Sequence, residues 1–141
     1  MDRIIGIDYG KVRTGLAVSD PLRIFASALD TVPTAKIIDY LQKYAIAERP
    51  VRFVVGWPVT TDGSPCETVP GVQEMVARLS KAFPGVPVDY EDERFTTVLA
   101  HRAMIDGGMK KSQRRDKNSV DKISAAIILQ GWLDRENRNR Q

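Results

Sequence analysis

Three short apolar runs, separated by turns, open the chain and constrain its fold more than any other feature. The runs span residues 3–8, 14–19 and 24–29, and the turns between them contain Gly10 and the dipeptide Asp20-Pro21. Connections this short join antiparallel strands, because a parallel crossover needs about a dozen residues or more. The sequence therefore predicts that the chain begins with a three-stranded antiparallel meander.

Helical and strand patterns alternate through the rest of the chain. In order, the predicted elements are a helix over 34–48, a strand over 52–55, a helix opened by Pro70 and marked by apolar residues from Val72 to Phe83, a strand over 86–90, a helix over about 96–105 and a last helix over about 120–136. Each of the two later strands is reached through a helix. Such connections predict parallel strands joined by right-handed crossovers.

The predicted fold class is α/β, with a mixed five-stranded sheet of three antiparallel and then two parallel strands, and helices on both faces. This is the RNase H-like arrangement, although the order of elements also fits other α/β folds. We expect the last strand to neighbour the first strand on its other side. A length of 141 residues suits one domain. We therefore predict a single domain over 1–141, with a flexible basic loop at 107–117 and a polar tail at 137–141.

The scarcity of cysteine and histidine limits the metal sites that the chain can build. Cys66 is the only cysteine and His101 the only histidine, which excludes a cysteine zinc site and the HExxH site of metalloproteases. Any metal site must therefore use mainly oxygen ligands. Such ligands favour Mg²⁺ or Mn²⁺ over zinc.

No segment of the sequence indicates a membrane. The apolar runs are all shorter than the roughly 18–20 residues needed to span a bilayer, and the opening MDRIIGIDYG has too short an apolar stretch for a signal peptide. We expect a cytoplasmic protein with no membrane partner. The net charge of +3 adds a weak indication of a polyanionic partner.

Three acids occupy positions typical of a metal site. Asp8 ends the first strand just before a glycine turn, Glu93 ends the last strand, and Asp121 lies in the first turn of the last helix, on its packed side. We expect the first two to lie close together at neighbouring strand ends. Carboxylates gathered in this way repel one another unless a divalent cation neutralises them. Two such ions, about 3.5–4 Å apart, support phosphodiester hydrolysis by a metal-bound water. We therefore predict Asp8, Glu93 and Asp121 as catalytic, metal-holding residues.

Each acid also has a purely structural interpretation. Asp8 is a common turn residue, the run from Glu91 to Glu93 could be a solvated charged segment, and Asp121 suits the start of a helix by its charge. The segment from Asp8 to Gly15 also resembles the phosphate loop of actin-like ATPases. Those proteins need two related domains, and no P-loop occurs here. The combination of three acids on these elements favours a nuclease.

A basic segment at 107–117 joins two helices and leads towards Asp121. Such a segment binds phosphates electrostatically, without base specificity, and we expect it to be poorly ordered without nucleic acid. The alternative interpretation of this basic segment is a solvated loop that binds nothing. The nucleic-acid-binding residues that we predict are Lys11, Arg13, Arg94, Lys110, Lys111, Arg114 and Arg115.

Four segments, in order, resemble the motifs of the YqgF/RuvX family. They are IGIDYG at 5–10 with Arg13 and GLAVSD at 15–20, VGWP at 55–58 with Asp62-Gly63, DERFTT at 92–97, and DKISAAIIL at 121–129. The resemblance implies an RNase H-like fold related to RuvC-type Holliday-junction resolvases. It also implies that the family's three acids fall on Asp8, Glu93 and Asp121, with Asp92 inside the same motif as Glu93. Val12 stands where many members have lysine, and Lys11 could take over that charge.

The resemblance implies two activities. Our preferred interpretation is a nuclease that acts on structured RNA, maturing the 5′ end of the small-subunit ribosomal RNA precursor. A ribosomal assembly intermediate is left open as a partner. The alternatives are a Holliday-junction DNA resolvase, which ordinarily needs a two-fold dimer, and a non-catalytic nucleic-acid-binding module of the same fold. Retention of three acids argues against the module, since clustered negative charge repels phosphates. The sequence does not fix the oligomeric state.

Overall fold

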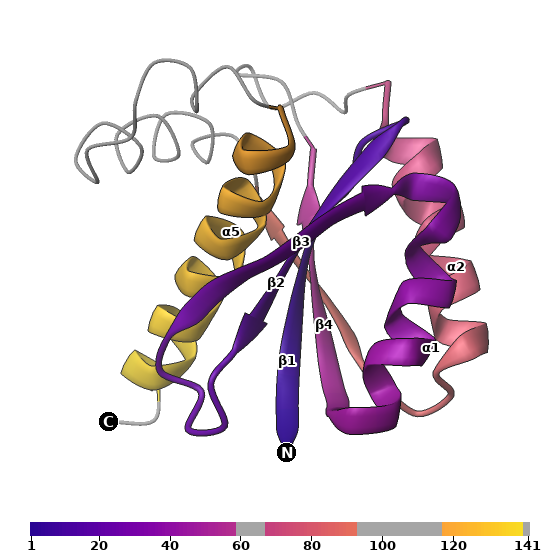
Figure 1. Ribbon diagram of the computed structural model, residues 1–141. Coiled ribbons are helices and arrows are strands. Elements are labelled where there is room, and N and C mark those ends of the chain that lie inside the picture. The colour runs from indigo at the N-terminus through magenta and orange to yellow at the C-terminus, as the bar shows by residue number, and fades with distance from the viewer. Residues whose placement is uncertain (59–66, 93–116, 140–141) are drawn as a thin grey trace.

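The computed structural model describes residues 1–58, 67–92 and 117–139, without the side chains of 117–120. The strands in this part of the chain are β1 (Asp2–Asp8), β2 (Arg13–Ser19), β3 (Ala26–Pro33), β4 (Arg49–Trp57) and β5 (Val88–Asp92). The helices are the short 3-10 helix η1 (Thr34–Lys36), α1 (Ile37–Ala47), α2 (Val69–Ala82) and α5 (Lys117–Asn139). They pack on the two faces of one sheet (Figure 1).

The sheet has the strand order β3-β2-β1-β4-β5, with β1 at its centre. β1 and β3 both pair with β2 in the antiparallel sense, whereas β4 pairs with β1 and β5 pairs with β4 in the parallel sense. The predicted mixed sheet of three antiparallel and then two parallel strands is confirmed. The expected position of the last strand is wrong, because β4 lies between β5 and β1. The crossover through α1 places β4 on the open edge of β1, so β5 can add only outside β4.

Alternation along the strands explains the apolar cores on both faces of the sheet. Successive side chains of a strand point to opposite faces. Ile5 and Ile7 of β1 therefore join a core with α1 and α2, whereas Ile4 joins a second core with α5. β4 divides in the same way, since Phe53 lies in the first core and Val54 in the second. Strands buried on both faces read as continuous apolar runs, which is the pattern seen at 4–7 and 53–55.

Helix α5 lies directly against the backbone of β1 and β2 at two glycines. A Cβ added to Gly6 would lie 2.8 Å from Leu129 Cβ, and one added to Gly15 would lie 2.0 Å from the backbone oxygen of Asp121. Both distances are too short for a real Cβ contact, so any side chain at these positions would lift the helix. The two glycines therefore set how closely the N-terminal half of α5 approaches the sheet.

The boundaries of several elements differ from those predicted. β3 begins at Ala26 rather than at residue 24, because the Asp20 carboxylate accepts hydrogen bonds from the backbone N–H groups of Ile24 and Phe25. That turn also holds Arg23 at a positive φ of 60°. α5 begins at Lys117, so Asp121 lies in its second turn and not in the first. The helix predicted at 96–105 lies outside the described residues, as does most of the basic segment at 107–117.

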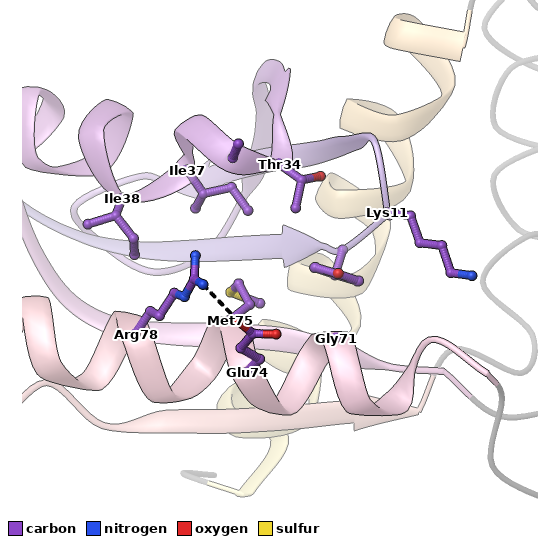
Figure 2. A pocket seen from close by; sticks show the side chains of 10 residues that line it. Lys11, Thr34, Ile37, Ile38, Gly71, Glu74, Met75 and Arg78 are labelled. Carbon is purple, nitrogen blue, oxygen red and sulfur yellow. Dashed lines mark hydrogen bonds and ion pairs between the residues drawn. The ribbon is translucent and has the colours of Figure 1, made fainter.

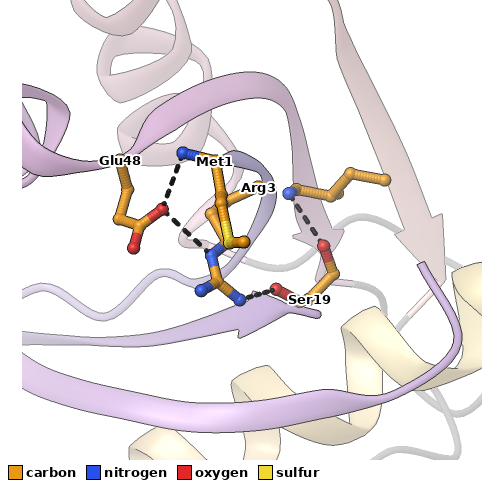
Figure 3. A network of polar contacts seen from close by, with 5 residues as sticks. Met1, Arg3, Ser19 and Glu48 are labelled. Atoms are coloured by element: carbon orange, nitrogen blue, oxygen red, sulfur yellow. Dashed lines mark hydrogen bonds and ion pairs between the residues drawn. The ribbon is translucent and has the colours of Figure 1, made fainter. Parts of the chain in front are cut away.

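A polar network holds the end of the sheet at which β1 and β4 begin, away from the end that carries Asp8 (Figure 3). Arg3 places Nε 3.3 Å from the Glu48 carboxylate and donates from Nη1 to the Ser19 carbonyl at 2.9 Å. The Ser19 hydroxyl accepts from the backbone N–H of Ile4 at 2.9 Å. Hydrogen bonds from Arg3, and then from the Met1 ammonium 3.2 Å away, lower the pKa of Glu48 below its ordinary value. The network thus links the start of β1 to the end of β2 and the start of β4.

The described helices include none that combines the length and the apolar character needed to cross a membrane.

Candidate functional site

The backbone of Gly15 brings Asp8 and Asp121 to the same part of the sheet. Asp8 pairs directly with Gly15 across the β1–β2 ladder. The bare face of Gly15 receives the backbone of Asp121, where α5 begins to cross the sheet. Asp8 has the same alternation as Ile4 and Gly6, which contact α5, so its side chain belongs to the α5 face. Two acids far apart in the sequence thus flank one glycine.

Arg13 supplies positive charge to this pair of acids. Its Nε lies 3.7 Å from Asp121 Oδ2, with 38% of the Arg13 side chain and 30% of the Asp121 side chain exposed. The Arg13 Nε is itself buried and has no hydrogen-bond partner among the described residues. The contact is therefore an ion pair without a formed hydrogen bond. It leaves the guanidinium half-exposed at the same end of the sheet as the Asp121 carboxylate.

The acids of β5 alternate between the two faces of the sheet. Asp89 and Glu91 face α5, where Asp89 accepts a hydrogen bond from Trp132 and Glu91 forms an ion pair with Arg135. Tyr90, between them, packs edge-to-face on Trp57 on the opposite face, with ring centroids 5.0 Å apart. Asp92 has the alternation of Tyr90, so its side chain is not directed to the α5 face. β5 ends there, one residue before Glu93.

Two of the three predicted acids can be placed, and they lie together. Asp8 and Asp121 flank Gly15, whereas Glu93 lies outside the described residues. Within the described residues, no group of three histidine, cysteine, aspartate or glutamate side chains is arranged to hold a metal ion. Of the two predicted cations in the β1–β2 hairpin, Lys11 is exposed and Arg13 is paired with Asp121. The remaining predicted cations, Arg94, Lys110, Lys111, Arg114 and Arg115, lie outside the described residues.

Sequence reasoning missed the cations that neutralise β5. Arg52 Nη1 lies 2.9 Å from Asp89 Oδ2, and its guanidinium lies 5.5 Å from the centroid of the Trp132 ring. Trp132 Nε1 donates to the same carboxylate oxygen at 3.1 Å. The alternating pattern VDYED could have indicated that Asp89 and Glu91 share a face. It carried no information about which basic residue from another element would meet each acid.

The comparison with known protein families agrees with this arrangement. The family described as "RuvX: Holliday junction resolvase" matches residues 2–135. The chain belongs to the RuvX family. This confirms the resemblance found in the sequence and the expected enzyme class, a hydrolase of phosphodiester bonds.

Curated relatives of this RuvX-family chain match it over nearly its whole length. One from Phocaeicola vulgatus is 48% identical over 134 residues, covering 95% of this chain and 96% of the relative. Another from Porphyromonas gingivalis is 45% identical over 138 residues, covering 98% of this chain and all of the relative. Both carry the name "Putative pre-16S rRNA nuclease".

Solved structures confirm the RNase H-like fold of this family member. Thermus thermophilus RuvC in complex with a Holliday junction substrate has a TM-score of 0.56 at 19% identity, with 96% of each chain covered. The fowlpox virus Holliday junction resolvase has a TM-score of 0.60 at 8% identity, covering 95% of this chain and 99% of that one. At these identities the likeness concerns the fold alone.

Proposed function

We propose that this RuvX-family chain is a cytoplasmic, metal-dependent nuclease that matures the 5′ end of the small-subunit ribosomal RNA precursor. One structural observation carries the proposal, which is the placement of Asp8 and Asp121 on either side of Gly15. Close relatives named as pre-16S rRNA nucleases supply the substrate class. The two acids lie where strand and helix backbones already touch, so the fold itself fixes their separation.

Asp8, Asp121 and Glu93 are the residues that we assign to Mg²⁺ or Mn²⁺. Carboxylate oxygens are the ligands that these ions prefer, and the Asp8–Asp121 pair provides such oxygens at one end of the sheet. Glu93 is the third ligand in this proposal rather than Asp92. The family resemblance gives Glu93 as the third acid, and Asp92 has the alternation of Tyr90, whose ring packs on the face of the sheet opposite α5. When bound, the metal supplies an activated water and neutralises the phosphate.

The chain's own residues hold and orient the substrate in this proposal. Arg13 lies beside Asp121, and in this proposal its guanidinium donates hydrogen bonds to a phosphate group of the RNA. Arginine binds phosphate groups in a bidentate manner. Lys11 extends from the same hairpin and is exposed. The further contacts to the RNA backbone that we propose are those of Arg94, Lys110, Lys111, Arg114 and Arg115. Contacts of this kind set affinity and salt dependence but not sequence preference.

The substitution Asp121→Asn tests the assignment. Asparagine keeps the shape of the side chain, and the half-exposed ion pair with Arg13 contributes at most about 1 kcal/mol. The metal-free variant should therefore melt close to the unsubstituted protein and still bind RNA, while cleavage of precursor RNA falls by orders of magnitude. Asp134→Asn is the matched control, because Asp134 is an exposed acid of the same helix and should leave cleavage intact. Undiminished cleavage by Asp121→Asn would remove Asp121 from the metal site.

Holliday-junction cleavage is the second candidate, because the family description names that activity. The two functions separate when the purified protein is incubated with precursor ribosomal RNA and with a four-way DNA junction, each with Mg²⁺ or Mn²⁺ and then with EDTA. We expect metal-dependent cleavage of the RNA. Paired cuts in the junction, without RNA cleavage, would favour the resolvase, and binding without cleavage of either would favour a non-catalytic module.

A further inference from the structure

A pocket opens on the face of the sheet opposite the one that Asp8 faces. It is lined by the next residue of the chain, Tyr9. Tyr9 follows Asp8 and lines a cavity of about 230 Å³ enclosed by the β1–β2 hairpin, η1, the start of α1 and α2. Figure 2 shows the cavity between the two helices, with Lys11 extending from the hairpin beside it. Strand alternation thus puts the acid on one face of the sheet and the pocket on the other.

The Tyr9 wall of the pocket is held in place by close backbone packing. A Cβ added to Gly71, in the first turn of α2, would lie 2.3 Å from the Tyr9 hydroxyl oxygen. The tyrosine can therefore approach the helix only because Gly71 has no side chain. On the other side, the Thr34 hydroxyl donates to the Gly10 carbonyl at 2.6 Å and lies 2.9 Å from the Thr14 hydroxyl. These contacts fix the hairpin against η1, so the pocket is preformed.

The lining of the pocket combines an aromatic ring, apolar side chains and positive charge. Ile37 and Met75 are buried and provide apolar surface, whereas Lys11 is exposed. Glu74 and Arg78 also line it and form an ion pair, with Arg78 Nη2 2.7 Å from the Glu74 carboxylate, so the net positive charge of the lining comes from Lys11. Aromatic rings stack on unpaired bases, and neighbouring cations hold the backbone phosphates of the same strand. The lining therefore suits one nucleotide better than a purely apolar ligand.

We infer that this pocket binds a single unpaired nucleotide of the RNA strand, next to the bond cut at Asp8 and Asp121. The inference rests on the proposed nuclease function. Asp8 and Tyr9 are consecutive residues at the C-terminal end of β1, so an RNA strand with a phosphate at Asp8 passes around this end of the sheet to place a neighbouring nucleotide in the pocket. The cavity is smaller than the roughly 300–1,000 Å³ of pockets for drug-sized ligands. It accommodates one base but not a base pair.

The consequence is a requirement for single-stranded RNA beside the cleavage site. A nucleotide that enters the pocket must leave its stack and its pairing partner. RNA paired through the cleavage site lacks this contact and binds only through its phosphates. The nuclease then distinguishes the unpaired end of a precursor from the folded RNA that adjoins it.

Filling the pocket tests the inference without changing the acids. Ala35 lines the cavity from η1 and is exposed, so Ala35→Phe should fold normally and occupy the space for the base. Ala47→Phe is the matched control, because Ala47 is exposed at the end of α1 and does not line the pocket. Binding is measured in EDTA with a single-stranded oligoribonucleotide and with a blunt RNA duplex. Loss of one stacked base should weaken single-strand binding about tenfold or more, with duplex binding unchanged.

A second measurement uses the unsubstituted protein and so does not depend on the folding of a variant. Single-stranded RNA that carries 5-iodouridine at one position at a time is photocrosslinked, and we expect one position to crosslink to Tyr9. Unchanged single-strand affinity of Ala35→Phe, an equal loss for both RNAs, or crosslinks that never include Tyr9 would each overturn the inference. Failure of metal-dependent cleavage by the unsubstituted protein would instead overturn the proposed function, so the two failures are distinguishable.

Discussion

The substitution Gly15→Ala isolates the contact that positions Asp121 against Asp8. The added methyl group would lie 2.0 Å from the Asp121 carbonyl oxygen, whereas real Cβ contacts are essentially never closer than 3.0 Å. The start of α5 must therefore withdraw from β2 by about 1 Å. The acids themselves remain chemically unchanged, so any loss of activity reports their separation.

The magnitude follows from the size of this displacement. Overfilling a packed contact costs about 1–3 kcal/mol, and the gain of about 0.5–1 kcal/mol that alanine has over glycine within a strand offsets part of it. The buried residues Leu129 and Leu133 still anchor the rest of the helix, so the protein should stay folded. A misplacement of about 1 Å at a catalytic group costs on the order of a hundredfold in rate. Activity should therefore fall far more than stability.

Gly131→Ala is the control for this prediction, because it adds the same methyl group to α5 itself. Its Cβ would lie 3.5 Å from Glu91 Oε2, an ordinary contact, and alanine is favoured over glycine in a helix interior by about 1 kcal/mol. We expect this variant to melt higher and to cleave precursor RNA normally. Urea denaturation gives the stability of both variants, and single-turnover cleavage gives their rates. Full activity in Gly15→Ala would refute the idea that this contact sets the spacing of the acids.

Three further predictions concern the framework of the protein. Leu129→Ala should cost about 2–5 kcal/mol in urea denaturation, because this side chain of α5 is fully buried against the sheet, and a smaller loss would mean that the core relaxes around the cavity. The pKa of Glu48 in the folded protein lies below its ordinary 4.5 because of the hydrogen bond from Arg3. The contribution of Glu48 to stability is therefore present above about pH 4.5 and is lost as the pH falls through the lower folded pKa. Glu48→Gln should make the melting temperature less dependent on pH over that acidic range. Arg135→Met should cost about 1–3 kcal/mol by leaving the nearly buried Glu91 without its ion pair, and adding Glu91→Gln should restore part of that loss if the pairing is the cause.

The sequence indicated the sheet because its signals are local. Short turns required antiparallel pairing of the first strands, and intervening helices required parallel pairing of the later ones. The order of β4 and β5 was missed, because no local pattern states which edge a strand joins. A usable signal was nevertheless present. Residues 53–55 are apolar without interruption, as in a strand covered on both faces, whereas Asp89 and Glu91 alternate with Val88 and Tyr90, as in an edge strand.

The sequence nominated residues for the candidate site but gave none of the contacts between them. Spacing placed Asp8 at a strand end, and the resemblance to the family paired it with Asp121. The ion pair between Arg13 and Asp121 was not foreseen, because it joins a hairpin to a helix that begins about a hundred residues later. The start of the last helix was also placed too late, at about residue 120, whereas α5 begins at Lys117. Contacts between distant elements depend on the packing of the whole chain.

Among the described elements α5 follows all of the strands, and this order has a consequence for the protein during its synthesis. The strands β1, β2 and β3 can pair as soon as they emerge, but in the part of the chain that the structure describes it is the late helix α5 that covers the face with Ile4, Ala17 and Val54. Gln130, for example, accepts a hydrogen bond from the N–H of Ala26 across 104 positions of sequence. A nascent chain that stops short of α5 exposes this apolar face to chaperones and proteases. It also lacks Asp121, so the pair of acids that flanks Gly15 forms only when the last helix is made.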